Sequence, residues 1–322
     1  MKVNLKIEIA FSRRKASRSV ADQAEKGLLF FRQAHGIIAQ RVACRQYSTA
    51  SNYQTAVRSL MNFCGNERLL CSDFSAGFLA DYERWLCEKG ISSNTSSCYM
   101  RSLRALLRRM GTDTRTAFDH VYTGRTATEK RAIMPADVRR LRNLELREGS
   151  HLCLCRDLFL MSVYCQGMPF VDLAHLKPDD IGGGYIRYRR RKTRQPVAVA
   201  IEPCILDIMN KYRQRGHPYV FPILKADNAD GRQHQYHSAL VSYNRSLKIL
   251  ARRAGIDHRL TSYVARHTWA SVAHLNGVDI ALISRAMGHT NTRTTLLYIK
   301  ELNPARQAEA NRRVLGSLGE AT

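Results

Sequence analysis

The chain has 322 residues, of which 44% are apolar, so it is long enough to bury the cores of two ordinary globular domains. Its 51 lysines and arginines against 27 acidic residues leave a formal net charge of +24, with a sequence pI near 10.1. A balance this basic favours a polyanionic partner, nucleic acid before an anionic membrane surface. No apolar run approaches the roughly 18 residues that cross a bilayer, and the N-terminus lacks the continuous apolar core of a signal peptide. We therefore expect a cytoplasmic, nucleoid-associated protein with no membrane partner.

Nine cysteines are scattered along the chain, and no two of them form a CxxC pair. His151, Cys153 and Cys155 could supply half of a metal site, but no second group with ligand spacing follows them. Reduced, buried thiols explain this pattern better than a metal cluster does. We expect neither a metal ion nor another cofactor.

Residues 1–21 alternate polar and apolar residues as a short strand would, and then become basic. The basic stretch contains Arg13, Arg14, Lys15 and Arg18. Such a run is either a solvated arm or an arm that lies on DNA.

Residues 22–111 show the apolar spacing of amphipathic helices. The first two predicted helix faces consist of Tyr53, Val57, Leu60, Met61 and Cys64, and of Phe74, Phe78, Tyr82, Trp85 and Leu86. A third helix begins at Ser93 or Asn94, and its apolar face consists of Tyr99, Leu103, Leu106, Leu107 and Met110.

The third helix also carries a basic face. Arg101, Arg104 and Arg108 lie at i, i+3 and i+7, and the stretch from Asn94 to Met110 contains no acidic residue. A solvated face usually mixes both signs, so this face favours contact with phosphates. We interpret residues 22–111 as a small helical domain that grips a DNA backbone.

Residues 112–132 are rich in Thr and Gly with weak periodicity, which predicts a linker. A second domain then covers residues 133–322. Helices are expected in it from Pro135, over about 152–165, after Pro203, over about 238–253 and in the C-terminal tail.

A β-hairpin is predicted inside the second domain, where two short apolar runs flank a basic turn. Four successive cations at residues 189–192 repel one another, and the repulsion is relieved if they flank phosphates. Arg190, Arg191 and Arg194 are therefore candidate DNA contacts. Lys192 lies at the turn, where its ammonium either reaches a reacting group or is merely exposed.

The stretch Leu260–Tyr298 contains an Arg-His pair at Arg266, a Gly-His pair ending at His289 and a tyrosine, Tyr298, nine residues later. Asp279 is a plausible N-cap for the helix between the two pairs, and Gly288 is its plausible stop. These elements could gather an arginine, an imidazole and a phenol at one point.

Together these residues resemble the tyrosine recombinases, the phage-integrase family, over about residues 25–315. RHTWAS resembles the box of the second catalytic arginine and gives Arg266, and MGH followed by Tyr resembles the box that gives His289 and Tyr298. The hairpin lysine of the family corresponds to Lys192 in RRRKTRQPV. The resemblance implies a mainly α fold with a small antiparallel sheet. It consists of a helical, SAM-like core-binding domain and a mixed α/β catalytic domain that together clamp DNA.

The sequence departs from the family pattern at two positions. Tyr263 stands where most members carry a histidine or lysine, and its phenol could still hydrogen-bond a phosphate oxygen. Pro169, in the stretch QGMPFVDL, stands where the first catalytic arginine belongs. Similar GMxFxD boxes are typical of a Bacteroidetes branch of the family, in which the charge can come from the preceding helix. Arg156 is our candidate for that charge, and a surface role for it is the alternative.

The resemblance implies that Tyr298 attacks a phosphodiester and forms a 3′-phosphotyrosyl link without metal or ATP. Arg266 would hold the phosphate, Lys192 would protonate the departing oxygen, and His289 would bind a phosphate oxygen or assist the tyrosine. The expected protein is an integrase of a mobile element or a DNA invertase. A DNA-binding relative without turnover and a type IB topoisomerase are the alternatives.

The partners that the resemblance implies are double-stranded DNA with specific sites and other copies of the chain. We expect a monomer when free and a homotetramer on DNA. The C-terminal tail either docks on a neighbouring protomer or folds back in cis.

Overall fold

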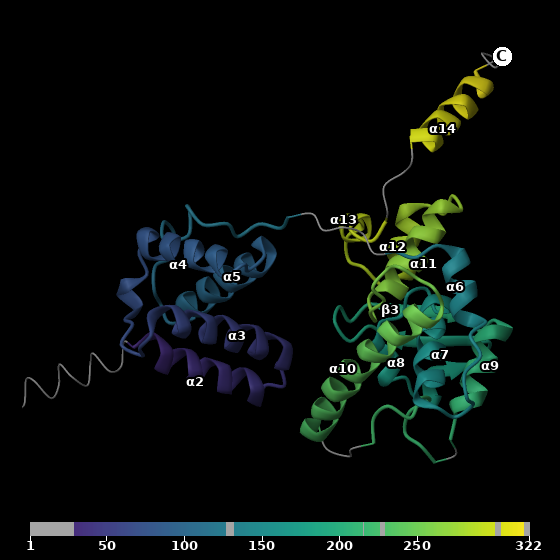
Figure 1. The fold of residues 1–322 in the computed structure, drawn as a ribbon, viewed down its shortest axis with the longest axis horizontal. Helices are drawn as coiled ribbons and strands as arrows, with labels where there is room; N and C mark the ends of the chain where they lie inside the picture. Colours follow the sequence, from purple (N-terminus) through teal and green to yellow (C-terminus); the bar gives the residue numbers. More distant parts are fainter. Residues whose placement is uncertain (1–28, 127–131, 215, 226–228, 300–303, 319–322) are drawn as a thin grey trace, which may run out of the picture. The chain divides into compact units, whose positions relative to one another are not determined.

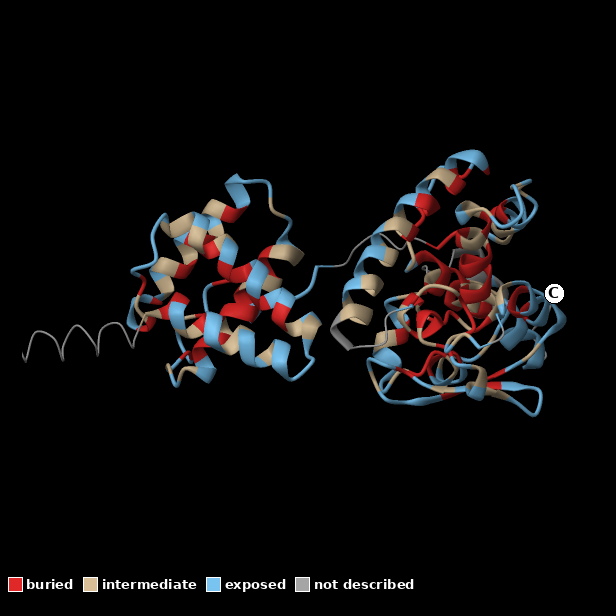
Figure 2. Cartoon of the chain, turned by 90° about the horizontal axis from the view of Figure 1, so that it is seen from below, coloured by how far each residue is buried: buried red, intermediate tan, exposed pale blue. Residues whose placement is uncertain are grey.

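The computed structural model describes residues 29–126, 132–214, 216–225, 229–299 and 304–318, and it divides the chain into two compact units, Met1–Thr128 and Glu129–Thr322. Each unit has its own buried core (Figure 2). The strand and basic arm expected over residues 1–21 lie outside the described residues.

The first unit is built from α-helices and one 3₁₀ turn (Figure 1). Its elements are α2 (Phe30–Ala43), α3 (Tyr47–Cys64), η1 (Cys71–Asp73), α4 (Ala76–Glu88) and α5 (Ser93–Arg109). Helix α3 packs against both α2 and α5, so its apolar face lies at the centre of this core.

Helix α5 has the amphipathic pattern that its sequence predicts. The hydroxyl of Ser92 caps its N-terminus by accepting a hydrogen bond from the backbone N–H of Thr95. Leu103, Leu106 and Leu107 are fully buried, whereas the arginines point to other sides of the helix. Packing of this face therefore fixes the direction in which the basic face of α5 points.

Residues 112–126 are part of the first unit rather than a free linker, which corrects our expectation. Phe118 and Val121 are buried in the helical core. The hydroxyl of Ser97 donates a hydrogen bond of 2.6 Å to the carbonyl of Gly124, and Asn94 bonds the backbone of Thr126. Only two apolar side chains anchor this segment, too few to give a periodic pattern in the sequence.

In the second unit, helix α7 lies in the core and other helices pack around it (Figure 1). Its first part contains α6 (Pro135–Arg142), α7 (His151–Tyr164), α8 (Phe170–Ala174), η2 (Pro178–Asp180) and α9 (Pro203–Tyr212). Its second part contains α10 (Ala229–Arg253), α11 (Val264–Leu275), α12 (Ile280–Ala286), α13 (Thr292–Leu296) and α14 (Pro304–Ser317). Helices α6, α8, α9, α10 and α11 all pack on α7.

The three strands form one antiparallel sheet in the order β1-β2-β3. They are β1 (Ile181–Gly182), β2 (Tyr185–Arg189) and β3 (Pro196–Ala200). The predicted hairpin is β2–β3, with Tyr188 opposite Val197, and its buried side chains alternate along each strand. The mainly helical fold with a small antiparallel sheet is confirmed.

Helix α12 begins and ends where its sequence predicts. The carboxylate of Asp279 accepts hydrogen bonds from the backbone N–H groups of Ala281 and Leu282, which makes it the N-cap. Gly288 has a φ of +63° just after the C-cap Met287, a conformation that favours glycine. Among the described residues, every helix is too short or too polar to cross a membrane.

Candidate active site

Arg266 lies in the first turn of α11 with its guanidinium almost completely buried. Its Nη1 donates a hydrogen bond of 2.7 Å to the carbonyl of Gly167, and its Nη2 donates one of 2.6 Å to the carbonyl of Met287. Its Nε has no hydrogen-bond partner in the protein, so one donor of the group is unsatisfied. Burial, followed by the charge of Arg190, lowers the pKa of Arg266 to about 10, which leaves it protonated at neutral pH.

His289 follows α12 and uses both of its ring nitrogens. Its Nε2 accepts a hydrogen bond of 2.9 Å from Nη2 of Arg266, so the proton of the neutral ring is on Nδ1, which donates to the hydroxyl of Thr295. Burial is the largest cause that lowers the pKa of His289 to about 4, and the charges of Arg266, Arg190 and Lys192 act in the same direction. The imidazole is therefore neutral at physiological pH.

Tyr298 lies in the turn after α13, beside the arginine and the imidazole. Its backbone carbonyl accepts hydrogen bonds from the hydroxyl of Ser271 and from Nδ1 of His267, both on α11. The guanidinium of Arg266 lies 5.5 Å from the centre of the Tyr298 ring, and the His289 ring centre lies 5.2 Å from it. Helix α11 thus holds both the arginine and the backbone of the tyrosine.

The hydroxyl of Tyr298 donates a hydrogen bond of 3.3 Å to the hydroxyl of Tyr263, and the two rings stack with centres 6.0 Å apart. Burial, then the neighbouring Tyr263, raises the pKa of Tyr298 to about 12. The structure therefore brings together four of the residues predicted from the sequence: Arg266, His289, Tyr298 and Tyr263.

Arg190 is a fifth member of this group, whereas the sequence placed it only among the DNA contacts of the basic turn. It is only 5% exposed. Its Nε lies 2.8 Å from a carboxylate oxygen of Asp172, and its Nη1 donates to the carbonyl of Met287, which also binds Arg266. The Nε contact is a close ion pair without the alignment of a hydrogen bond. A run of four cations can bury one member because a buried carboxylate offsets its charge.

Asp172 comes from the same stretch in which Pro169 replaces the expected arginine. Pro169 is the N-cap of the short helix α8, and Asp172 lies inside that helix, almost fully buried. One carboxylate oxygen pairs with Arg190, and the other accepts a hydrogen bond of 3.0 Å from the backbone N–H of Arg191. Burial raises the pKa of Asp172. The hydrogen bond from the backbone of Arg191 and the charge of Arg190 act in the opposite direction. An aspartate in an apolar stretch is the signal that could have pointed to a buried cationic partner.

Arg156 is not part of the group, which corrects its assignment as the replacement arginine. Its Nε donates a hydrogen bond of 2.8 Å to Asp157, and its Nη1 donates one of 2.7 Å to the carbonyl of Leu144. Asp157 is also bound by Lys211 and Tyr212 of α9. These bonds hold Arg156 in a cluster that joins α7 to α9, away from the hydrogen bonds of Arg266.

The remaining hairpin residues Arg191, Lys192 and Arg194 are exposed in the turn between β2 and β3. The hydroxyl of Thr193 donates a hydrogen bond of 3.0 Å to the carbonyl of Gly288, which ties this turn to the residue before His289. The charge of Lys192 contributes to the low pKa of His289. The turn thus presents an ammonium at the edge of the site.

The arginines predicted on α5 line a groove of about 470 Å³ on the first unit. The groove is lined by Tyr53, Arg101, Arg104, Ala105, Arg108 and Arg109. The Nε of Arg108 donates to the hydroxyl of Thr114, and the guanidinium of Arg104 lies 5.8 Å from the Phe118 ring centre. The groove therefore carries four arginines on one face.

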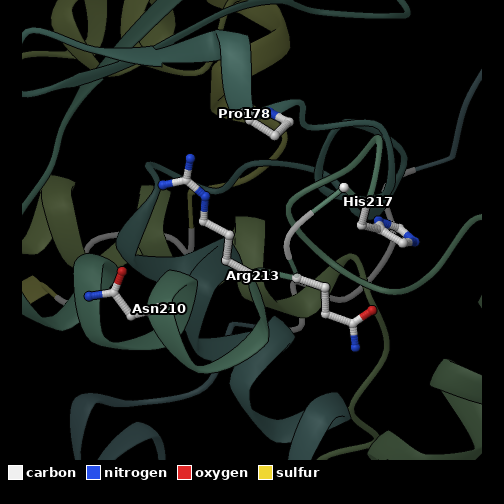
Figure 3. Close-up of a pocket in the computed structure, with 6 residues that line it drawn as sticks. Pro178, Asn210, Arg213 and His217 are labelled. Carbon is white, nitrogen blue, oxygen red and sulfur yellow. The ribbon is translucent and has the colours of Figure 1, made fainter.

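A separate pocket of about 520 Å³ lies at the end of α9 (Figure 3). The labelled side chains of Asn210, Arg213 and His217 point in different directions, so they do not converge on one ligand (Figure 3). None of the predicted site residues lines it. Within the described part of the chain, no group of three or more His, Cys, Asp or Glu residues could hold a metal ion.

Two models of known protein families match the chain. Residues 138–303, about half of the chain, match the phage integrase family, and residues 29–110 match the phage integrase SAM-like domain. The chain belongs to the phage integrase family. The second match falls on the helices of the first unit, and the first contains Arg190, Arg266, His289 and Tyr298.

Curated relatives of this phage integrase family member are distant. A tyrosine recombinase of Thermosipho africanus is 27% identical over 139 residues, which cover 42% of this chain and 46% of the relative. The tyrosine recombinase XerD of Listeria monocytogenes is 22% identical over 219 residues, which cover 66% of this chain and 73% of the relative. The first match therefore spans less than half of that relative's length.

A solved structure shares the fold. The Tn1549 transposon integrase, in complex with transposon right end DNA, has a TM-score of 0.60 and 14% identity. The match covers 88% of this chain and 99% of that one. At this identity the likeness concerns the fold alone.

Gly167 and Gly149 provide a test of how tightly Arg266 is packed. Both have a φ of +71°, but a Cβ at Gly167 would lie 3.0 Å from the Cα of Arg266, whereas a Cβ at Gly149 would meet nothing within 4 Å. Gly149→Ala should cost only the left-handed backbone penalty of about 1–2 kcal/mol. Gly167→Ala should cost more, because the backbone of α11 must also shift. Urea unfolding of both variants measures this, and equal losses of stability would contradict the packing argument.

His289 should make the folded state sensitive to acid. Its folded-state pKa of about 4 lies below the ordinary value near 6.5, so between these pH values the unfolded chain binds the proton first. Stability is therefore lost as pH falls from about 6.5 towards 4. Thermal melting at pH 7.5 and pH 5 should show a larger drop in Tm for the wild type than for His289→Gln. Identical drops in the two proteins would be inconsistent with a depressed pKa.

Proposed function

We propose that the chain is a tyrosine-type site-specific DNA recombinase that cuts and rejoins DNA through a 3′-phosphotyrosyl intermediate. The observation that carries the proposal is the sharing of the Met287 carbonyl by two buried guanidinium groups next to a phenol. Paired guanidiniums beside a hydroxyl nucleophile suit the transition state of phosphoryl transfer, which spreads negative charge over the phosphoryl oxygens.

In the proposed reaction, the Tyr298 oxygen forms a bond to phosphorus while the bond from phosphorus to the 5′ oxygen breaks. The ester between tyrosine and the 3′ phosphate keeps the energy of the broken bond. A 5′ hydroxyl of another strand can therefore reverse the step without ATP. With a pKa near 12, Tyr298 is almost entirely protonated at neutral pH, so attack depends on neighbouring groups.

Arg266 and Arg190 are the proposed phosphate ligands. The unsatisfied Nε of Arg266 supplies one donor, and the guanidinium of Arg190 supplies the charge that Pro169 leaves missing. The neutral imidazole of His289 accepts a hydrogen bond from Nη2 of Arg266 and so holds this guanidinium in place. A tautomer with the proton on Nε2 would instead donate to a phosphate oxygen. Lys192, in the hairpin turn, is the proposed general acid for the departing 5′ oxygen.

The proposed partner is double-stranded DNA with a specific site. The four-arginine groove of the first unit would bind its phosphates, and the exposed hairpin residues Arg191 and Arg194 would add contacts. The exposed Val314, Leu315 and Leu318 on or beside α14 suit docking on a second copy, and we propose a homotetramer on DNA formed from free monomers. The QGMPFVDL stretch supports placement in the Bacteroidetes-type branch, as a mobile-element integrase or invertase acting in the cytoplasm.

Covalent trapping tests the reaction. The target site is first selected by binding from a library of randomised duplexes, and a nicked suicide duplex is then built on it. The wild type should form an adduct at the 3′ phosphate that survives denaturing electrophoresis. Tyr298→Phe should form no adduct, although it should bind the duplex with the same affinity as the wild type. Peptide mapping of the adduct should identify Tyr298.

Two other outcomes of this experiment identify other functions. Tight binding by the wild type with no adduct under any condition would mean a DNA-binding relative without turnover. Relaxation of a supercoiled plasmid that lacks the selected site would mean a type IB topoisomerase activity.

Arg190 and Arg156 should differ in their importance for cleavage. Removing one charge-stabilising donor typically costs about 10²–10³ in rate, so Arg190→Ala should lose at least that much. Arg156→Ala should cleave at nearly the wild-type rate at temperatures where it is folded, because Arg156 binds Asp157 and not the site. Single-turnover cleavage of the suicide duplex measures both. Loss of cleavage in a folded Arg156→Ala variant, with Arg190→Ala unaffected, would reverse the assignment.

A further inference from the structure

Thr193 ties the turn between β2 and β3 to the end of α12. Its hydroxyl donates a hydrogen bond of 3.0 Å to the carbonyl of Gly288. On the other side of Lys192, the backbone N–H of Arg191 donates one of 3.0 Å to Asp172 on α8. Both chain neighbours of Lys192 are therefore bonded to parts of the second unit that lie outside the hairpin.

The turn is also closed on itself. The backbone N–H of Arg194 donates a hydrogen bond of 2.8 Å to the carbonyl of Arg190, and that of Arg190 donates one of 2.9 Å to the carbonyl of Gln195. Arg194 has a φ of +60°, a left-handed conformation that a residue with a side chain adopts at a cost. Because these bonds fix the shape of the turn, its bonds to α8 and α12 decide where it lies relative to the site.

The ammonium of Lys192 depends on this turn for its position. Lys192 is exposed, and its charge is carried on a flexible aliphatic stem. The same charge is one of the causes that lower the pKa of His289, so the ammonium lies close enough to act on the imidazole. A flexible group reacts efficiently only when the backbone that carries it is held in place.

The bond of Thr193 can be removed without changing a proposed phosphate ligand. Arg190 is such a ligand, and Asp172 offsets its charge, so changing either of them would disturb the phosphate site itself. Thr193 is half-buried, and its hydroxyl bonds a backbone carbonyl rather than a group that reacts. Valine has nearly the same shape as threonine but lacks the hydroxyl.

We propose that Thr193 is a positioning residue whose hydroxyl holds the turn against α12, so that the ammonium of Lys192 reaches the departing 5′ oxygen. This role rests on the proposed recombinase function. In cleavage, the Tyr298 oxygen bonds to phosphorus and its proton leaves to water. The bond from phosphorus to the 5′ oxygen breaks, its electron pair stays on that oxygen, and a proton passes to it from Nζ of Lys192. In rejoining, the neutral amine of Lys192 takes a proton from the attacking 5′ hydroxyl, and the departing Tyr298 oxygen takes one from water.

A better leaving group tests this role in single-turnover cleavage. Two suicide duplexes differ only in the bridging atom of the scissile phosphate, which is a 5′ oxygen or a 5′ sulfur. A thiol has a pKa of about 8.5, so a thiolate leaves without a proton, whereas an alkoxide needs one. Thr193→Val should cleave the oxygen duplex about 10²-fold more slowly than the wild type, and the sulfur duplex at the wild-type rate. Thr193→Ser keeps the hydroxyl and should match the wild type on both duplexes.

Lys192→Ala provides the matched control, because it removes the proposed general acid itself and should show the same contrast between the two duplexes. Adding Thr193→Val to Lys192→Ala should slow cleavage of the oxygen duplex no further, since Thr193 would then have no acid to position. Thr193→Ala also lacks the hydroxyl and should behave as Thr193→Val does. Thermal melting shows which variants are folded at the assay temperature.

Three results would overturn the proposal. The first is cleavage of the oxygen duplex at the wild-type rate by a variant that lacks the Thr193 hydroxyl. The second is an equal loss of rate on both duplexes, which would mean that the hydroxyl supports the site as a whole. The third is a further loss of rate when Thr193→Val is added to Lys192→Ala. Failure of the recombinase proposal is distinct, because the wild type would then form no adduct with either duplex.

Discussion

The buried contact between Asp172 and Arg190 is the interaction on which the site depends. Two guanidinium groups that share one carbonyl would repel each other strongly in a medium of low polarity. The carboxylate of Asp172 lies against one of them and offsets part of that repulsion. Burial of Arg266 close to a second cation is therefore possible only because α8 brings an anion into the same core. The stretch in which Pro169 stands in place of the expected arginine thus also contains Asp172, which positions the guanidinium of Arg190.

The backbone around these side chains is arranged to leave room for them. The positive φ of Gly167 turns its carbonyl towards Arg266, and a side chain at this position would strike α11. At Gly288, a Cβ would lie 2.8 Å from the Cγ of Arg190 and 2.9 Å from a methyl of Val197. Both glycines thus allow close approach of the chain to an arginine, as well as a left-handed turn.

Much of the site could be predicted from the sequence, because its parts lie on regular elements with readable ends. The Asp279 cap and the Gly288 stop correctly gave the ends of the helix that precedes His289. The choice between Arg156 and Arg190 could not be made in this way. Periodicity shows which face of a helix is apolar, but it gives no information about which buried anion a long cationic side chain will reach. The pairing of Arg190 with Asp172 joins residues 18 positions apart through the tertiary fold.

The backbone carbonyls of Met287 and Gly288, at the end of α12, connect the cationic groups of the site to one another. Met287 binds both arginines, and Gly288 binds Thr193 in the turn that carries Lys192. Three hydrogen bonds from two separate parts of the second unit, α11 and the turn between β2 and β3, therefore end on two adjacent peptide groups. A shift of this short helix would break all three bonds together, and would leave Arg266 on the carbonyl of Gly167 and Arg190 on Asp172. The end of this one helix therefore fixes the distance between the two guanidiniums and the turn that carries Lys192.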